Sequence, residues 1–141
     1  MEYIVMPEKS CFILNKIQTP DDGAISEPLS IGVYSVKKSG GVKDLKIGIL
    51  GFGPIGMSVM LAAKASGIES IYVTDKINPR LLIASKEGAD ITGNPLNEDI
   101  VAKILKHANL GLDIVFECCG MQEAFDNAVD ILKPGGKLVV V

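Results

Sequence analysis

The sequence has few cysteines, little net charge and no long apolar run, and each shortage excludes a class of protein. Three cysteines in 141 residues do not make a disulfide framework, so a small secreted scaffold is excluded. A net charge of −3 gives no electrostatic reason to expect nucleic acid or an anionic membrane as partner. No segment approaches a membrane span, and no signal pattern opens the chain. We therefore expect one reduced, cytoplasmic domain.

The sequence does contain, from residue 45 onward, a regular alternation of apolar strands and amphipathic helices. The expected strands lie at 45–50, 70–75, 90–92, 112–117 and 137–141. The expected helices lie at about 54–66, 79–87, 97–108 and 121–132. The strands are apolar on nearly every residue, which indicates that both faces are covered. This pattern predicts an α/β fold with a doubly wound parallel sheet.

The first 44 residues have a different character. Two short strands are expected in "YIVMP" and "CFIL", which places Cys11 in a strand. A helix should follow in "SEPLSIGVYSVKK", with Ser26 or Glu27 as its N-cap, Pro28 in its first turn, and two glycines after its end. Two isolated strands cannot bury their own faces, so we expect this segment to belong with something larger.

A glycine-rich turn carries the main functional signal. Gly51, Gly53 and Gly56 form a G-x-G-x-x-G pattern that follows an expected strand and opens an expected helix. Gly51 allows the tight turn, Gly53 lets a pyrophosphate approach the backbone, and Gly56 allows close helix–strand packing. The helix then begins at Pro54, whose ring removes an N–H that would have no helical partner, and the free amides from Ile55 onward and the positive helix end favour phosphate. The turn predicts a dinucleotide site in a Rossmann-type fold.

Two residues after the second strand bear on the choice of dinucleotide. Asp75 lies about 20 residues after Gly56, the spacing expected for a carboxylate that binds the adenosine ribose. Its charge would repel a 2′-phosphate, so NAD is favoured over NADP. Arg80 is able to serve a 2′-phosphate, but beside Asp75 we expect it to pack on or bond to the ribose.

Three other interpretations stay open at this point. In the first, the glycine turn is structural and binds no ligand. In the second, Asp75 is an ordinary cap of the following turn. In the third, the protein is an S-adenosylmethionine-dependent methyltransferase. Methyltransferases also have a glycine-rich first turn and an acidic residue after the second strand. The position of the third glycine, and a helix start suited to phosphate, favour the dinucleotide.

Seven ordered segments resemble the zinc-dependent medium-chain alcohol dehydrogenases, most of all the sorbitol, polyol and threonine dehydrogenase branch. They include "EYIVMPE", "EPLSIGVYSV", "VTDKINPR", "VFECCG" and "LKPGGKLVVV", and cover nearly the whole chain. The resemblance implies that residues 1–24 are the tail of a missing GroES-like catalytic domain. It implies that residues 25–141 are an NAD-binding Rossmann domain truncated after its fifth strand.

The resemblance also implies an activity for the complete enzyme. It would be an oxidoreductase in which zinc polarises a small secondary alcohol or polyol while NAD accepts the hydride. No catalytic residue is assigned within this chain, and zinc is not expected in it. Alone, the chain would be a binding module that holds NAD(H) without catalysis.

Four further residues receive an interpretation. In polyol dehydrogenases the glutamate matching Glu27 lies beside the catalytic zinc, whereas by itself Glu27 is typical of a helix cap. Cys118 and Cys119 lie in the "ECxG" turn that passes under the cofactor in the family, and adjacent cysteines suit neither a zinc site nor a disulfide. His107 is expected at the surface, near a helix end.

The expected fifth strand also predicts assembly. It would lie at the edge of the sheet, and "KLVVV" is β-branched with a single charge, at Lys137. Its unpaired backbone groups invite another chain. We therefore expect a homo-oligomer.

Overall fold

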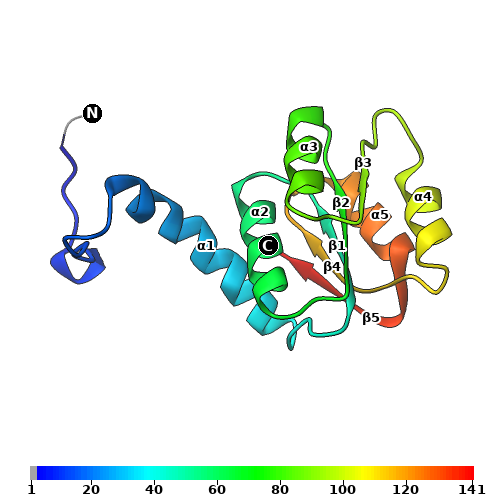
Figure 1. Cartoon of the computed structure of the whole chain (residues 1–141), viewed down its shortest axis with the longest axis horizontal. Coiled ribbons are helices and arrows are strands. Elements are labelled where there is room, and N and C mark those ends of the chain that lie inside the picture. The colour runs from blue at the N-terminus through cyan, green and yellow to red at the C-terminus, as the bar shows by residue number, and fades with distance from the viewer. Residues whose placement is uncertain (1–2) are drawn as a thin grey trace.

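The computed structural model describes residues 3–141, so the first two residues of the expected N-terminal tail lie outside the described residues. Five strands form one parallel sheet in the order β3-β2-β1-β4-β5. The strands are β1 (Lys46–Leu50), β2 (Ser70–Thr74), β3 (Ile91–Gly93), β4 (Leu112–Glu117) and β5 (Leu132–Val140). The helices are α1 (Pro20–Lys38), α2 (Pro54–Ala65), α3 (Asn78–Lys86), α4 (Ile100–His107) and α5 (Gln122–Ile131). The predicted doubly wound α/β fold is confirmed (Figure 1).

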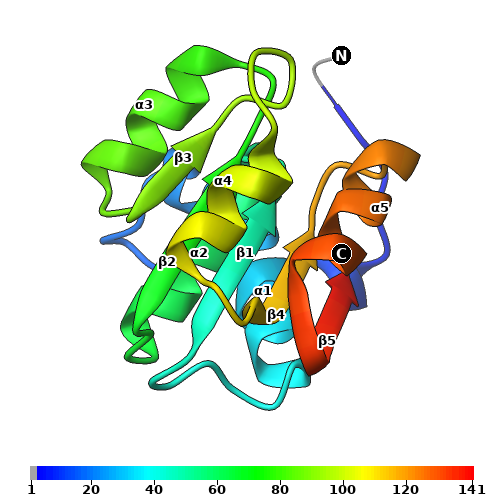
Figure 2. The same cartoon turned by 90° about the vertical axis from the view of Figure 1, so that its right-hand side faces the viewer.

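Helices cover both faces of the sheet, as the continuous apolar strands predict. On one face, Ile47 and Ile49 of β1 belong to a buried cluster to which α1, α2 and α3 contribute. On the other face, Leu50 of β1 belongs to a cluster to which α4 and α5 contribute. Successive residues of a strand point to opposite faces, so a strand buried on both sides must be apolar throughout. Figure 2 shows α4 and α5 in front of the sheet and α1 and α2 behind it.

The fifth strand starts earlier than predicted. Leu132 already pairs with Leu112 of β4, directly after α5 ends. The register then shifts before Ile114 pairs with Lys137. A positive φ of 77° at Gly135 lies within this irregular stretch, so the regular "LVVV" pattern marks only its second half. β5 is an edge strand among the described residues, as predicted.

The prediction of two strands before residue 20 is wrong. The described part of this segment contains one short 3-10 helix, η1 (Glu8–Ser10), and otherwise irregular chain. Cys11 follows η1 and is not in a strand. Val5 and Ile13 are each 98 % exposed, and the segment projects from the sheet (Figure 1). A strand needs a neighbouring ladder for its backbone groups, and this segment has none within the described residues.

The first long helix also begins earlier than predicted. Thr19 is its N-cap, and its hydroxyl accepts from the Asp22 N–H at 3.2 Å while Asp22 accepts from the Thr19 N–H at 2.7 Å. Ser26 and Glu27 are therefore not N-caps, and Pro28 lies inside the helix. α1 runs without a break past residues 24 and 25, where a domain division was expected, and that division stays a prediction. The predicted end before Gly40 and Gly41 is confirmed.

The second half of α1 packs closely against α2. A Cβ added to Gly32 would lie 2.4 Å from the carbonyl carbon of Ser58, so only glycine permits this approach. Ser58 is buried at the contact, and its hydroxyl donates to the Pro54 carbonyl at 2.7 Å. α1 thereby supports α2 from outside, and α2 begins at the glycine turn. Within the described residues, no helix is both long and apolar enough to cross a membrane.

Candidate functional site

The carboxyl ends of β1, β2 and β4 bring the predicted residues to one edge of the sheet. β1 leads into the glycine turn, β2 into Asp75, and β4 into Cys118 and Cys119. β1 lies between β2 and β4: the chain moves from β1 outward to β2 and β3, and then crosses back past β1 to β4 on its other side. In open α/β sheets, ligands bind in the crevice outside the strand ends at such a switch point.

Two glycines of the turn are required by the fold itself. Gly51 has a φ of +93°, and a Cβ there would lie 2.9 Å from the Cβ of Cys119. A Cβ on Gly56 would lie 2.0 Å from the Gly51 carbonyl oxygen, because α2 packs directly on the turn. The predicted roles of Gly51 in the tight turn and Gly56 in close packing agree with this geometry.

Gly53 differs from both. Its φ of −77° and ψ of −168° are open to any residue. A Cβ built there would meet one heavy atom within 4 Å, the Arg80 Nη1 at 3.8 Å. Neither backbone strain nor packing therefore demands glycine at this position. The open space above Gly53 is what a ligand lying against the backbone would need.

The start of α2 offers hydrogen-bond donors beside this space. Gly53 is the N-cap and Pro54 the first helical residue, so that position has no N–H. The Met57 N–H donates to the Gly53 carbonyl at 2.9 Å and closes the first turn. The N–H groups of Ile55 and Gly56 precede this bond and have no acceptor within the helix. A helix start of this kind favours an anion.

Asp75 joins the turn after β2 to the glycine turn. Its side chain is 6 % exposed. Oδ2 accepts from the Phe52 N–H at 2.7 Å, and Oδ1 accepts from the Ile77 N–H at 2.7 Å. Asp75 is not the N-cap of α3, which is Ile77. The carboxylate is thus held at the strand end by two backbone donors.

Arg80 of α3 connects Asp75 with Gly53. Its Nη1 lies 3.5 Å from Asp75 Oδ2 and 3.8 Å from the place where a Gly53 Cβ would sit. The Arg80 side chain is 40 % exposed. The glycine turn, one carboxylate and one guanidinium therefore share a single corner of the sheet edge.

Glu117, the last residue of β4, is a site residue that the sequence pattern did not predict. It is 2 % exposed, and its Oε1 accepts from the N–H groups of Cys119 and Gly120 at 2.8 and 2.9 Å. The carboxylate therefore shapes the turn that faces the glycine turn. The available signal was an acidic residue closing an otherwise apolar strand directly before a turn with glycine.

Glu117 also affects the two cysteines. Burial, with the nearby Glu117 charge, raises the pKa of the Cys118 thiol to about 12. Burial and the hydrogen bond from the Cys119 thiol to Glu117, at 3.0 Å, raise the pKa of Cys119 to about 12 as well. Both thiols are protonated at neutral pH, whereas metal binding and nucleophilic attack need the thiolate. Contact of this turn with a cofactor stays a prediction.

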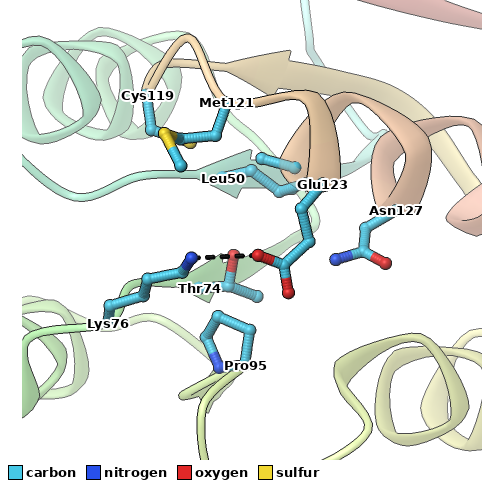
Figure 3. Close-up of a pocket in the computed structure, with 9 residues that line it drawn as sticks. Leu50, Thr74, Lys76, Pro95, Cys119, Met121, Glu123 and Asn127 are labelled. Carbon is cyan, nitrogen blue, oxygen red and sulfur yellow. Dashed lines mark hydrogen bonds and ion pairs between the residues drawn. The ribbon is translucent and has the colours of Figure 1, made fainter.

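A small pocket opens between the ends of β1 and β2 and the start of α5 (Figure 3). It holds about 30 Å³ of free space, roughly the share of one water molecule. Leu50 and Thr74 lie on its strand side, and Met121 and Asn127 line it from the other side. Lys76 Nζ and Glu123 Oε2 form an ion pair of 2.9 Å at this pocket.

Among residues 3–141, no three histidine, cysteine or acidic side chains gather where a metal ion would bind. Glu27 is exposed in the middle of α1, with its carbonyl accepting from the Ser30 hydroxyl at 2.7 Å. The described residues thus do not fit a zinc ion on their own, and a role for Glu27 beside zinc stays a prediction. His107 is exposed at the end of α4, as predicted, with Nδ1 2.9 Å from the Lys103 carbonyl.

Comparison with known proteins agrees with this geometry. The family model described as zinc-binding dehydrogenase matches residues 54–141. L-idonate 5-dehydrogenase of Vitis vinifera is 35 % identical over 98 % of this chain and 39 % of its own length. Sorbitol dehydrogenase of Bacillus subtilis is 32 % identical over 100 % of this chain and 40 % of its own. The chain thus spans about two fifths of the length of these relatives.

Solved structures show the same likeness. A putative zinc-binding dehydrogenase from Sinorhizobium meliloti, bound to NADP, superposes with a TM-score of 0.89 at 29 % identity, over 99 % of this chain and 42 % of that one. The 2R,3R-butanediol dehydrogenase of Bacillus subtilis superposes with a TM-score of 0.81 at 31 % identity, over 92 % of this chain and 38 % of that one. These matches confirm the predicted resemblance and leave no place for the methyltransferase interpretation. The chain belongs to the zinc-binding dehydrogenase family.

Proposed function

We propose that this chain binds a nicotinamide dinucleotide at the carboxyl edge of its sheet, as the cofactor domain of an alcohol or polyol dehydrogenase. The observation that carries the proposal is Gly53. A glycine that neither the backbone conformation nor the packing requires stands at the mouth of an anion-binding helix. Room for a ligand against the backbone explains it directly.

The dinucleotide would be held at two points. Its pyrophosphate would lie over Gly53 and accept from the free N–H groups of Ile55 and Gly56. Its adenosine ribose would lie beside Asp75, whose carboxylate has about four acceptor sites. Two of those sites are used by backbone donors and a third by Arg80 Nη1, so capacity remains for one ribose hydroxyl. Arg80 lies between the two points and would contact the ribose.

NAD is the favoured cofactor because Asp75 places a negative charge where a 2′-phosphate would be. NADP is the second candidate, since the Sinorhizobium meliloti relative carries it. Two features weigh toward NAD here. Asp75 is fixed by the Phe52 and Ile77 N–H groups and is not free to turn away. Its nearest cation, Arg80, is directed to the carboxylate itself.

The complete enzyme would oxidise a small secondary alcohol or polyol, the class named by the L-idonate and sorbitol dehydrogenase relatives. Zinc, when bound in such an enzyme, polarises the alcohol oxygen. The described residues of this chain would bind the dinucleotide and orient its nicotinamide. We expect the chain alone to bind the cofactor without turning over alcohol, and homo-oligomers and a zinc-side role for Glu27 belong to the same proposal.

Calorimetric titration with NADH and NADPH tests the proposal. We expect NADH to bind more tightly, and Asp75→Asn to narrow the difference because the charge that opposes the 2′-phosphate is removed. Asp90→Asn is the matched control. Asp90 also accepts a strand N–H, from Ile71 at 2.7 Å, but it lies at the amino ends of the strands, away from the proposed site. Equal or tighter binding of NADPH by the unmutated chain would overturn the choice of NAD. A folded chain that binds neither dinucleotide would overturn the proposal.

A further inference from the structure

Four charged side chains in and around the turn after β2 form two separate pairs. Arg80 lies 3.5 Å from Asp75, and Lys76 lies 2.9 Å from Glu123. Each cation therefore has its own carboxylate. No cation in this group is left over to receive a further negative charge.

The Lys76–Glu123 pair joins parts of the chain that are distant in sequence. Lys76 directly follows Asp75 in the turn after β2, and Glu123 stands in the first turn of α5. Their side chains meet at the small pocket (Figure 3). A carboxylate is stabilised in the first turn of a helix, so Glu123 is well placed to hold the ammonium group.

We propose that Glu123 is a specificity-determining residue that keeps Lys76 from pairing with a 2′-phosphate. This inference rests on the proposed dinucleotide site. A 2′-phosphate would be carried by the same ribose that Asp75 faces, and Lys76 is the adjacent residue. A free ammonium there would attract the phosphate as a point charge. With Glu123 in place, that attraction is cancelled, and the repulsion by Asp75 remains.

The pair acts on the ligand more than on the fold. The side chains of Lys76 and Glu123 are 41 % and 57 % exposed, and exposed pairs contribute little to stability. Replacing Glu123 should therefore leave unfolding almost unchanged. Release of one exposed cation should strengthen NADPH binding about fivefold, the upper range for such pairs. Salt should reduce the gain.

Three variants test the inference by titration of NADH and NADPH at low and high salt. Glu123→Gln removes the charge that holds Lys76. Asp126→Asn is the matched control, because Asp126 lies on the same helix and is hydrogen-bonded by Gln122 at 2.8 Å instead of by Lys76. The double variant Glu123→Gln with Lys76→Gln removes both members of the pair.

We expect Glu123→Gln to strengthen NADPH binding with NADH binding unchanged, Asp126→Asn to change neither, and the double variant to lose the gain. NADH binding with no gain for NADPH in Glu123→Gln would overturn the inference. The same gain in Asp126→Asn, or a gain that persists in the double variant, would overturn it too. If no variant bound NADH, the proposed function would have failed and the inference with it.

Discussion

Gly53 and Gly56 stand three residues apart in one turn, and alanine should affect them in opposite ways. Gly53→Ala places a Cβ in open space, 3.8 Å from Arg80 Nη1, at an ordinary φ of −77°. Gly56→Ala places a Cβ 2.0 Å from the Gly51 carbonyl oxygen. We expect the first change to remove ligand binding with the fold intact, and the second to damage the fold.

The expected loss at Gly56 comes from a backbone clash. Its Cβ would be about 1 Å closer to the Gly51 oxygen than side chains approach, and it would also crowd Ile49 at 3.3 Å. Overpacking costs about 1–3 kcal/mol, and this case belongs at the upper end because the partner is backbone. Alanine is a better helix former than glycine, which stabilises the variant by up to about 1 kcal/mol. The net loss is about 2 kcal/mol, or a fall of roughly 5–10 °C in Tm.

The expected change in stability at Gly53 is small. Fewer unfolded conformations stabilise the alanine variant by about 0.4–1 kcal/mol. Loss of glycine at the N-cap of α2 costs a similar amount, because alanine is a poor N-cap. The two effects nearly cancel. The methyl group would occupy the space proposed for the pyrophosphate, so NADH affinity should fall at least about tenfold, or 1.4 kcal/mol.

Thermal unfolding and NADH titration of Gly53→Ala and Gly56→Ala test both expectations. Gly53→Val places a bulkier side chain at the same position as Gly53→Ala. Circular dichroism establishes that each variant tested for binding is folded. The reasoning is refuted if Gly53→Ala binds NADH as tightly as the unmutated chain. It is also refuted if Gly53→Ala loses as much stability as Gly56→Ala, because Gly53 would then serve the fold.

Two further predictions follow from the turn after β4 and from the edge of the sheet. The pKa of Cys118 and of Cys119 is about 12 in the folded chain, against about 8.5 in an unfolded one. The free energy of unfolding should therefore keep its full value below pH 8.5 and fall as the pH rises toward 12, because the unfolded chain loses these protons first. Denaturant titrations at pH 8 and pH 10 should show this loss of stability, and a variant with both Cys118→Ala and Cys119→Ala should show less of it. If the free energy of unfolding fell equally with pH in both proteins, the thiols would have no such role. β5 is an edge strand with Val140 62 % exposed, so the chain should self-associate and Val140→Lys should weaken that association. Light scattering that finds the unmutated chain monomeric at high concentration would contradict this expectation.

Local signals account for what the sequence predicted correctly. Continuous apolar strands, helix periodicity and the three glycines act over a few residues, and they predicted the five strands and the placement of Gly51, Gly53 and Gly56. Asp75 was found by its spacing from the glycine turn, because a βαβ unit has a nearly constant length. These features depend on chain neighbours, so a sequence reveals them directly.

Competing local signals explain one error. Both "TPDD" and "SEP" are typical of a helix start, and the helix was expected to begin at the second. The structure uses the first, because Thr19 and Asp22 satisfy each other's backbone N–H groups. The strands expected before residue 20 are absent from the described residues for a different reason. β-branched residues form a strand only where a neighbouring strand is present to pair with them.

The chemistry of the candidate site was decided by tertiary structure. The burial of Glu117 beneath the Cys118–Cys119 turn, and the double hydrogen bonding of Asp75, follow from how the β1, β2 and β4 ends meet. Lys76 and Glu123 are 47 residues apart and pair only because the turn after β2 faces α5. Sequence alone determined which side chains reach the sheet edge, since strand ends are local. Which charges neutralise one another there was decided by the fold, because electrostatic pairing depends on distance in space and not along the chain.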